Sequence, residues 1–392
     1  MDRRLVALFL TIFVSLIGFG IIIPLLPFYA ESFGASPFQI GLLFASFSIS
    51  QLIASPLLGD LSDRFGRRPV LMASLLGTAV SFLIMALAQS LLALFLARII
   101  DGLSGGNITT ARAYVADVTT EENRARGYGV IGAAFGLGFI IGPGLGGAFS
   151  MISYTAPIWV AVILTLGAIV VAWAWLPETV HRVEAGGVSW WRLLPSMLRR
   201  DGLGRLLGVD FLYWLAFAMF QTTFALFGER RFGFGLAQTG YLMSGFGLLG
   251  VFVQVGLIGR AVAAYGERRV LVAGLAFAAL GIGLAAASRS VTMFVVALVP
   301  VALGMGFCNP TLASLLSRSA DPSDQGKVQG TAGALESLGR TIGPVMGNGL
   351  LQQAGEGSAY ASASALIVLT LALATFGGGL SVPEPPGQAP AE

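Results

Sequence analysis

The chain has 392 residues, of which 55% are hydrophobic and only 11% are charged, whereas soluble domains carry about 25% charged residues. A soluble protein this apolar would have too few polar residues to cover its surface, so the composition indicates an all-α membrane protein. The single cysteine and single histidine exclude a disulfide framework and a clustered Cys/His metal site. The net charge of +3 is too small to indicate a nucleic-acid partner.

Long apolar stretches follow one another along the whole chain, and their joints carry Gly, Pro or charged residues. A membrane-spanning helix needs about 20 apolar residues. On this criterion we predict twelve spans, at residues 5–29, 38–58, 69–88, 91–115, 127–149, 155–176, 206–227, 237–258, 270–288, 291–315, 327–351 and 358–379. No small-residue cleavage site is evident after the first stretch, so we expect it to remain as a helix.

The basic residues are distributed unevenly between the two sides of these spans. If both termini are cytoplasmic, eighteen Arg and Lys residues fall in inner loops and at inner helix ends. Only Arg230, Arg231 and Arg289 then fall in outer loops. Cytoplasmic loops carry the excess of Lys and Arg in membrane proteins. The distribution therefore predicts a multi-pass protein with both termini in the cytoplasm.

The stretch Gly59–Leu71, GDLSDRFGRRPVL, interrupts the apolar runs with a cluster of charges. It must lie in water or at a membrane surface. Gly59 and Gly66 are predicted to break the flanking helices and to allow a tight turn. A basic loop that follows the positive-inside rule would explain the arginines alone.

The same pattern recurs 200 residues later, in the stretch Gly259–Leu271, GRAVAAYGERRVL. A chain that repeats itself near its half-length consists of two similar halves, and repeated halves are typical of transporters. We therefore predict an N-terminal six-helix bundle at 1–176, a cytoplasmic linker at 177–205 and a C-terminal six-helix bundle at 206–380. The Pro-rich tail at 381–392 is expected to be disordered.

The linker contains a stretch with two different helical faces, Ser189–Arg200. Apolar residues including Trp190 and Trp191 fall on one face, and Arg192 falls on the other. This pattern predicts an amphipathic helix on the cytoplasmic leaflet. Pro195 counts against one continuous helix, and the alternative is an unstructured linker.

The stretch Gly59–Leu71 resembles the loop between helices 2 and 3 of the major facilitator superfamily, G-x-L-a-D-r-x-G-r-k-x-x-l. The resemblance implies two six-helix bundles around a central cavity. It also implies a cytoplasmic gate, in which the acid after helix 4 meets a loop arginine and the loop aspartate caps helix 11. By position these residues are Asp117, Arg67 and Asp63, and the whole predicted gate comprises Gly59, Asp63, Arg64, Gly66, Arg67, Arg68 and Asp117. Because Ala263 stands in the second half where Asp63 stands in the first, this latch is expected on one side only.

The fifth predicted span carries glycines four residues apart, at Gly138, Gly142 and Gly146. One stripe of this helix lacks side chains, so another helix can approach closely, and Pro143 permits a bend. Ordinary small-residue packing would account for the stripe. The stretch also resembles the helix-5 signature g-x-x-x-G-P-x-x-G-G, which is associated with the exporter branch of the family.

Charged residues inside predicted spans are candidates for proton coupling, because burying a charge in a membrane is costly. Arg98 and Asp101 share a face of the fourth span, and Glu336 and Arg340 share a face of the eleventh. Self-neutralised structural pairs are the alternative. In resembling exporters an arginine in the pattern R-x-x-x-G, matched by Arg98, is linked to proton coupling. Asp210 is expected at the membrane interface, and the cavity candidates are Asn107, Arg112, Gln221 and Asn309.

Most of the chain resembles the tetracycline/proton antiporter group of drug exporters, for example in AYVADVTTEENRARGYG (113–129) and LFGERRFGFG (226–235). The chain departs from that group at Ser15, where the group carries an acid, and it has no acid in the ninth span. The resemblance implies a proton-coupled exporter of small, mostly apolar compounds in a bacterial inner membrane. The alternatives are a facilitator or importer of a metabolite and a non-transporting sensor. No enzyme motif is present; the expected partners are a small-molecule substrate, protons and the lipid bilayer, with no cofactor or metal and a monomeric protein.

Overall fold

The computed structural model describes residues 3–105, 107–179, 190–200, 202–320 and 324–376. All regular elements in these ranges are helical. They are α1 (Arg3–Glu31), α2 (Pro37–Phe65), α3 (Arg67–Ala86), α4 (Leu91–Ser104), α5 (Asn107–Val118), α6 (Glu121–Ser150), α7 (Ala156–Trp175), α8 (Trp190–Leu198), α9 (Leu203–Phe232), α10 (Leu236–Phe252), the π-helix η1 (Val253–Leu257), α11 (Ile258–Tyr265), α12 (Glu267–Ala287), α13 (Val291–Arg318), α14 (Gln325–Ala354) and α15 (Glu356–Phe376). The predicted disordered tail and linker residues 180–189 lie outside the described residues.

Ten stretches in the described part of the chain are long and apolar enough to cross a membrane. One of them, Leu236–Tyr265, joins α10, η1 and α11, so the predicted span 237–258 contains a π-helical turn and extends seven residues further. The predicted spans 91–115 and 327–351 are not among the ten. The first is divided into α4 and α5, and the second, α14, is rich in polar residues and glycine. The total of twelve therefore stays a prediction.

The joint between α2 and α3 is a single residue. Helix α2 continues through Gly59 to Phe65, and only Gly66, with φ at 106°, leaves the helical conformation. The expectation that Gly59 breaks the helix is therefore wrong, because a glycine inside a helix costs only about 1 kcal/mol relative to alanine. The second copy has the same construction, with Gly266 at φ 78° between α11 and α12.

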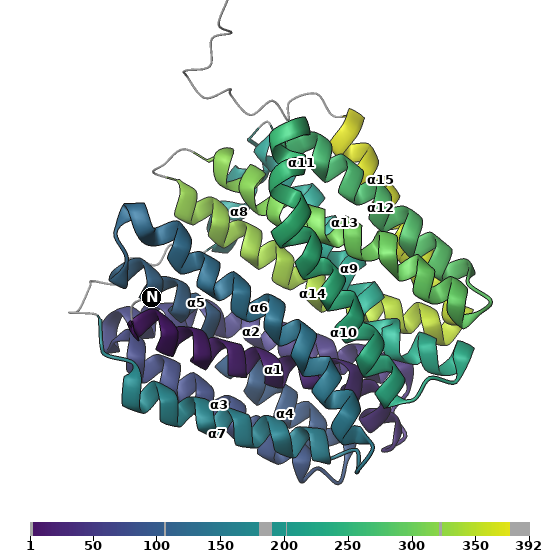
Figure 1. The fold of residues 1–392 in the computed structure, drawn as a ribbon, viewed down its shortest axis with the longest axis horizontal. Coiled ribbons are helices and arrows are strands. Elements are labelled where there is room, and N and C mark those ends of the chain that lie inside the picture. Colours follow the sequence, from purple (N-terminus) through teal and green to yellow (C-terminus); the bar gives the residue numbers. More distant parts are fainter. Residues whose placement is uncertain (1–2, 106, 180–189, 201, 321–323, 377–392) are drawn as a thin grey trace, which may run out of the picture.

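The helices form two groups that follow the order of the chain (Figure 1). In the first group α1 packs on α6 and α7, and α3 packs on α4 and α7. In the second group α9 packs on α14 and α15, and α12 packs on α13 and α15. The repeated sequence thus produces a repeated packing arrangement. Helix α2 packs on α14 and helix α6 packs on α10, and these contacts join the two groups.

The glycine stripe of α6 faces α1. A Cβ atom added at Gly142 would lie 2.7 Å from the Cα atom of Gly20, and one added at Gly138 would lie 2.6 Å from the Cβ atom of Leu16. At Gly146 the nearest atom would be the carbonyl oxygen of Ile21, at 3.2 Å. These positions allow the two backbones to approach closely, as the four-residue spacing predicts. Helix α6 also runs without interruption through Pro143.

The stripe has a counterpart in the second group. A Cβ atom added at Gly343 on α14 would lie 2.6 Å from the carbonyl oxygen of Leu215 on α9. Asn348, which stands where the last glycine of the signature would be, is fully buried. Its amide donates to the carbonyl oxygen of Pro344 at 2.9 Å and to the hydroxyl of Thr222 at 3.4 Å. The close approach of α1 to α6 is therefore reproduced between α9 and α14.

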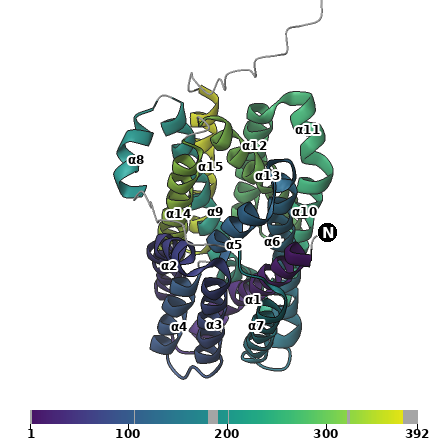
Figure 2. The same ribbon diagram turned by 90° about the vertical axis from the view of Figure 1, so that its left-hand side faces the viewer.

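Helix α8 lies in the predicted amphipathic stretch, and its nine residues include Pro195. The objection from this proline is therefore wrong. Figure 2 shows α8 outside α14, and α8 packs on α14 and α9, with Met197 only 1% exposed. Arg200, just beyond the helix, pairs with Asp324 at 2.9 Å. The location of α8 on the membrane surface stays a prediction, and the side chains of Trp190, Trp191 and Arg192 lie outside the described part.

Candidate functional site

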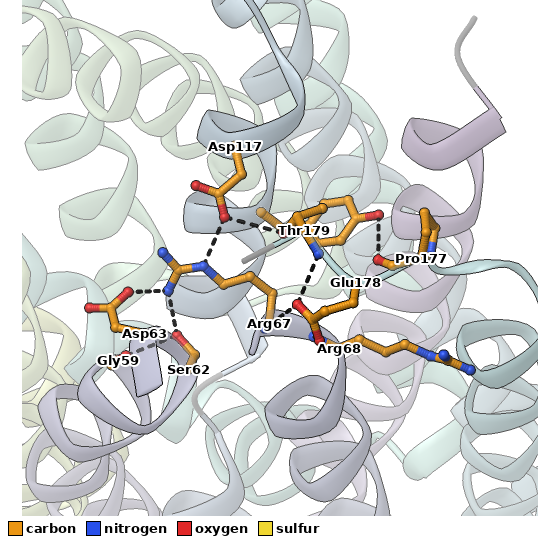
Figure 3. Close-up of polar contacts among 10 residues, drawn as sticks. Gly59, Ser62, Asp63, Arg67, Arg68, Asp117, Pro177, Glu178 and Thr179 are labelled. Atoms are coloured by element: carbon orange, nitrogen blue, oxygen red, sulfur yellow. Dashed lines mark hydrogen bonds and ion pairs between the residues drawn. The ribbon is translucent and has the colours of Figure 1, made fainter. Parts of the chain in front are cut away.

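The joint between α2 and α3 holds a network of polar contacts around Arg67 (Figure 3). The Nε atom of Arg67 donates to the Oδ2 atom of Asp117 on α5 at 2.9 Å. Its Nη1 atom donates to the hydroxyl of Ser62 at 2.7 Å and also pairs with Asp63. These partners allow Arg67 to be buried, because a buried charge must be paired and hydrogen-bonded. The contact between Arg67 and Asp117 is the one that the family resemblance implies.

Asp63 lies in a different place from the one expected. The resemblance implies that it caps the helix corresponding to α14. In the described part of the chain Asp63 forms an ion pair with Arg67, four residues further along the sequence. No hydrogen bond among the described residues joins Asp63 to α14. Asp63 thus acts in this structure as the second carboxylate of the Arg67 network.

Glu178, which sequence reasoning missed, caps the start of α3. It accepts hydrogen bonds from the backbone nitrogen atoms of Arg67 at 2.8 Å and Arg68 at 3.2 Å. A carboxylate at this position satisfies unpaired N–H groups and interacts favourably with the helix dipole. The only signal in the sequence was an acid directly after the sixth span.

The remaining predicted gate residues lie around this network. The Nη2 atom of Arg68 donates to the carbonyl oxygen of Trp173 at the end of α7, at 2.5 Å. The hydroxyl of Thr179 donates to Asp117 at 3.3 Å. Arg64 is exposed, and Gly59 has no atom within 4 Å of the position of an added Cβ. The network therefore ties α2, α3, α5 and the segment after α7 together, all within the first group of helices.

The second copy of the joint contains an ion pair of opposite polarity. Glu267 stands where Arg67 stands in the first copy, and it pairs with Arg318 on α13 at 3.4 Å. Glu267 also accepts a hydrogen bond from the hydroxyl of Ser314 at 2.6 Å. The expectation of an ion pair on one side only is therefore wrong. It rested on the loss of the aspartate at Ala263 and did not consider a pair with its charges exchanged.

Arg98 and Asp101 form a pair deep inside the first group of helices. They lie 3.1 Å apart, and their side chains are 2% and 6% exposed. The guanidinium of Arg98 lies 4.2 Å from the ring centre of Phe47 on α2. The pair is therefore internally neutral and shielded from water in this conformation.

Glu336 and Arg340 form the corresponding pair in the second group, and they are more open. They lie 2.8 Å apart, and their side chains are 28% and 41% exposed. The guanidinium of Arg340 lies 4.4 Å from the ring centre of Trp214 on α9, which indicates a cation–π contact. Both residues lie near the middle of the 30-residue helix α14.

The cavity candidates lie on separate helices. Arg112 is exposed on α5, while Gln221 on α9 and Asn309 on α13 are half-buried. No hydrogen bond or ion pair in the described part of the chain joins these three residues. The side chain of Asn107 lies outside the described part. Among the described residues, no group of three His, Cys, Asp or Glu side chains could hold a metal ion.

Asp210, which the sequence leads us to expect at the membrane interface, is covered by protein and only 1% exposed. It lies seven residues after the start of α9, which packs on α14 and α15, and its depth in the membrane stays a prediction. The structure thus adds a third acid within a long apolar helix to the two that the sequence analysis recognised.

These features define a multi-pass helical membrane protein with a repeated packing unit, a charged joint in each repeat, and ion pairs inside its helices. This is the architecture of a membrane transporter rather than of an enzyme. The chain belongs to the Major Facilitator Superfamily, whose family model matches residues 8–260 and 211–392.

Similar proteins include drug-resistance proteins from bacteria and one solved human structure. The chain is 33% identical over 357 residues to the tetracycline resistance protein, class C, of Escherichia coli, covering 88% of this chain and 89% of that protein. It is 32% identical over 346 residues to multidrug resistance protein 2 of Bacillus subtilis (strain 168), covering 86% of each. The crystal structure of the human organic anion transporter MFSD10 matches with a TM-score of 0.74 at 28% identity, covering 95% of this chain and 99% of that one.

Proposed function

We propose that the protein is a proton-coupled exporter of small, mostly apolar compounds that works by alternating access. The observation that carries this proposal is the half-open Glu336–Arg340 pair in the middle of a long helix, in a chain similar to tetracycline and multidrug resistance proteins. Transporter sites lie near the midplane of the membrane. An acid that is accessible at that depth is suited to take up and release a proton, and Arg98 and Asp101 are the second candidate pair.

We further propose that the twelve predicted spans form two six-helix bundles, at 1–176 and 206–380, joined by the linker at 177–205. On this assignment α4 and α5 together make the fourth span, and α14 makes the eleventh. The matching helix contacts in the two groups support it. The excess of basic residues supports an orientation with both termini in the cytoplasm, in a bacterial inner membrane and as a monomer.

The contacts between the two groups support alternating access. We call the end of the molecule that holds the Arg67 network the motif end. In the described part of the chain three hydrogen bonds join the two groups of helices, and each lies away from the motif end. Arg230 pairs with Glu31 at 3.2 Å, the backbone nitrogen of Phe38 donates to Gln352 at 3.0 Å, and the hydroxyl of Ser244 donates to the carbonyl oxygen of Ile140 at 2.5 Å. Closure at the far end without hydrogen bonds at the motif end is the arrangement of an inward-facing transporter, in which Asp63, Arg67 and Asp117 would belong to the open gate.

A facilitator without proton coupling is the second candidate function. It is favoured by one observation: Asp101 and Glu336 each have an arginine on their own helix. A neutral pair has less need of a proton than an isolated acid. The exposure of Glu336 and Arg340 nevertheless favours the exporter.

The test is transport of a panel of apolar compounds into proteoliposomes across an imposed pH gradient. We expect accumulation that collapses with a protonophore. Glu336→Gln, which mimics the protonated acid, should abolish accumulation and retain exchange of substrate down its gradient. Asp101→Asn should have this effect instead if the buried pair carries the proton. Transport by wild type that only equilibrates the compound and ignores the protonophore would establish the facilitator instead.

A further inference from the structure

Asp210 is an ionisable group deep inside the protein that the proposed coupling pair does not yet use. Its side chain is buried, and its Oδ2 atom has no hydrogen-bond partner among the described residues. A buried charged oxygen without a partner is costly, because it has lost its water and gained nothing in return. Such a group needs either a counter-ion or a proton.

The packing of α9 on α14 places Asp210 near the Glu336–Arg340 pair. Helices α9 and α14 approach closely here: a Cβ atom added at Gly339 would lie 2.9 Å from the backbone nitrogen of Leu215. The same added Cβ would lie 3.2 Å from the carbonyl oxygen of Phe211, the residue after Asp210. Four residues beyond Asp210 on α9, the ring of Trp214 contacts the guanidinium of Arg340. Asp210 therefore lies beside the segment of α14 that carries Glu336 and Arg340.

The charges at this site do not balance. Two carboxyl groups, Asp210 and Glu336, face one guanidinium, and Arg340 donates to Glu336 at 2.8 Å. The Nε atom of Arg340 is buried and has no partner among the described residues. Two further titratable groups that are buried in the described part of the chain, Tyr213 on α9 and Cys308 on α13, are neutral at pH 7 in their ordinary state. With both acids ionised, the site would carry one uncompensated negative charge.

The Arg98–Asp101 pair provides the comparison within the same chain. Its acid, Asp101, is buried like Asp210, but the pair contains one acid and one base and therefore balances. A site with two carboxyl groups and one guanidinium has no net charge only when one of the carboxyl groups holds a proton. Paired carboxyl groups that share a site cannot both ionise readily, because like charges repel at short range.

We propose that Asp210 and Glu336 form a single proton-binding site with Arg340 as their shared counter-ion. This inference rests on the proposed proton-coupled export and names its site. While Arg340 pairs with Glu336, Asp210 carries the proton. When Arg340 moves towards Asp210, the O–H bond of Asp210 breaks, the carboxylate pairs with the guanidinium, and the proton passes to Glu336. The exposed side of Glu336 then gives it to water.

The first test measures the proton without any transport. Infrared difference spectra of the purified, substrate-free protein between acid and alkaline pH report the carbonyl band of protonated carboxyl groups. We expect a buried band in wild type that Asp210→Asn removes and Asp101→Asn leaves in place. Asp210→Glu, which keeps an acid, should retain a shifted band. If the band is unchanged in Asp210→Asn, or if Asp101→Asn removes it instead, the site is not at Asp210.

The second test measures coupling in proteoliposomes with a compound that wild type accumulates. A one-proton exchange gives about a tenfold change in accumulation for each unit of pH gradient. We expect Asp210→Asn to lose this dependence and to retain exchange. Accumulation by Asp210→Asn that still follows the gradient overturns the inference and leaves proton-coupled export intact. A wild type that ignores the gradient but shows the band contradicts the proposed function and not the site.

Discussion

The two copies of the charged joint have the same backbone construction and different ionic contacts. In each, one glycine with positive φ separates two helices, and the arginine two residues after this glycine reaches the end of the last helix of its own group. Arg68 donates to the carbonyl oxygen of Trp173 on α7, and Arg268 donates to those of Ala374 and Thr375 on α15.

The ion pair between the joint and the neighbouring helix has opposite polarity in the two copies. The first copy places a base on α3 and an acid on α5, and the second places an acid on α12 and a base on α13. Asp63 and Glu178 provide additional contacts in the first copy. The comparison teaches that attraction between the joint and the neighbouring helix is retained in both halves, whereas its polarity is not. It also identifies the first copy as the more elaborate of the two.

Reversing the charge of Arg67 should have the largest effect. Arg67→Glu would place a third negative charge beside Asp63 and Asp117, and breaking a buried ion pair costs about 3–5 kcal/mol. We expect a large drop in the thermal unfolding temperature of the purified protein and loss of transport in cells. The unfolding temperature is measured on the purified variant, and transport is measured in cells that express it.

The charge-exchanged double variant is the control for this change. Arg67→Glu with Asp117→Arg reproduces the polarity of the second copy and should recover part of the stability that the single variant loses. The same exchange in the second copy, Glu267→Arg with Arg318→Glu, should be better tolerated, because fewer other charges surround it. No recovery in either double variant would show that polarity matters as much as attraction.

The joint glycines should differ by a smaller amount. Alanine at either position adopts an unfavourable positive φ, which costs about 1–3 kcal/mol. A Cβ atom at Gly66 would also run into Glu178, whereas one at Gly266 meets nothing within 4 Å. Gly66→Ala should therefore lower the unfolding temperature more than Gly266→Ala. Equal shifts would mean that Glu178 does not hold the start of α3.

The smallest effect concerns the start of α14. Hydrogen bonds from Lys327 and Arg200 lower the pKa of Asp324 below its usual range. A carboxyl with a lowered pKa stabilises the folded state at pH values above its unfolded pKa of about 3.9, and this contribution is lost as the pH falls through the folded value.

Asp324→Asn should therefore lower the unfolding temperature slightly at pH 7. The difference from wild type should shrink as the pH falls below the unfolded pKa of about 3.9 and through the folded value. Thr120, at the start of α6, makes no side-chain cap, so Thr120→Val should show no such pH dependence. A constant difference for Asp324→Asn across the pH range would contradict the assignment.

Much of the fold could be predicted because the length of an apolar stretch directly indicates a membrane-spanning helix. The positions of the long helices and the close approach along Gly138 and Gly142 needed only local sequence. Helix ends were less predictable. Gly59 lies inside a helix because its small intrinsic cost is outweighed by the continuing backbone hydrogen bonds of α2.

The site was only partly predictable, because its contacts join distant parts of the chain. The pairs Arg98–Asp101 and Glu336–Arg340 could be found from their spacing on one helix. Glu178 lies 111 residues from the nitrogen it caps, so no local pattern points to it. The burial of Asp210 depends on which helix covers it, and one sequence without its packing does not contain that information.

The opposite polarity of the two joints has a consequence for how a duplicated chain assembles. Two similar halves could exchange neighbours while the protein folds, so that α3 docked against α13 and α12 against α5. Such an exchange would set Arg67 against Arg318 and Glu267 against Asp117. Both contacts would be repulsive, and like charges juxtaposed at an interface cost several kcal/mol. The inverted pairs therefore favour packing of each joint on the helix of its own half over packing on the equivalent helix of the other half.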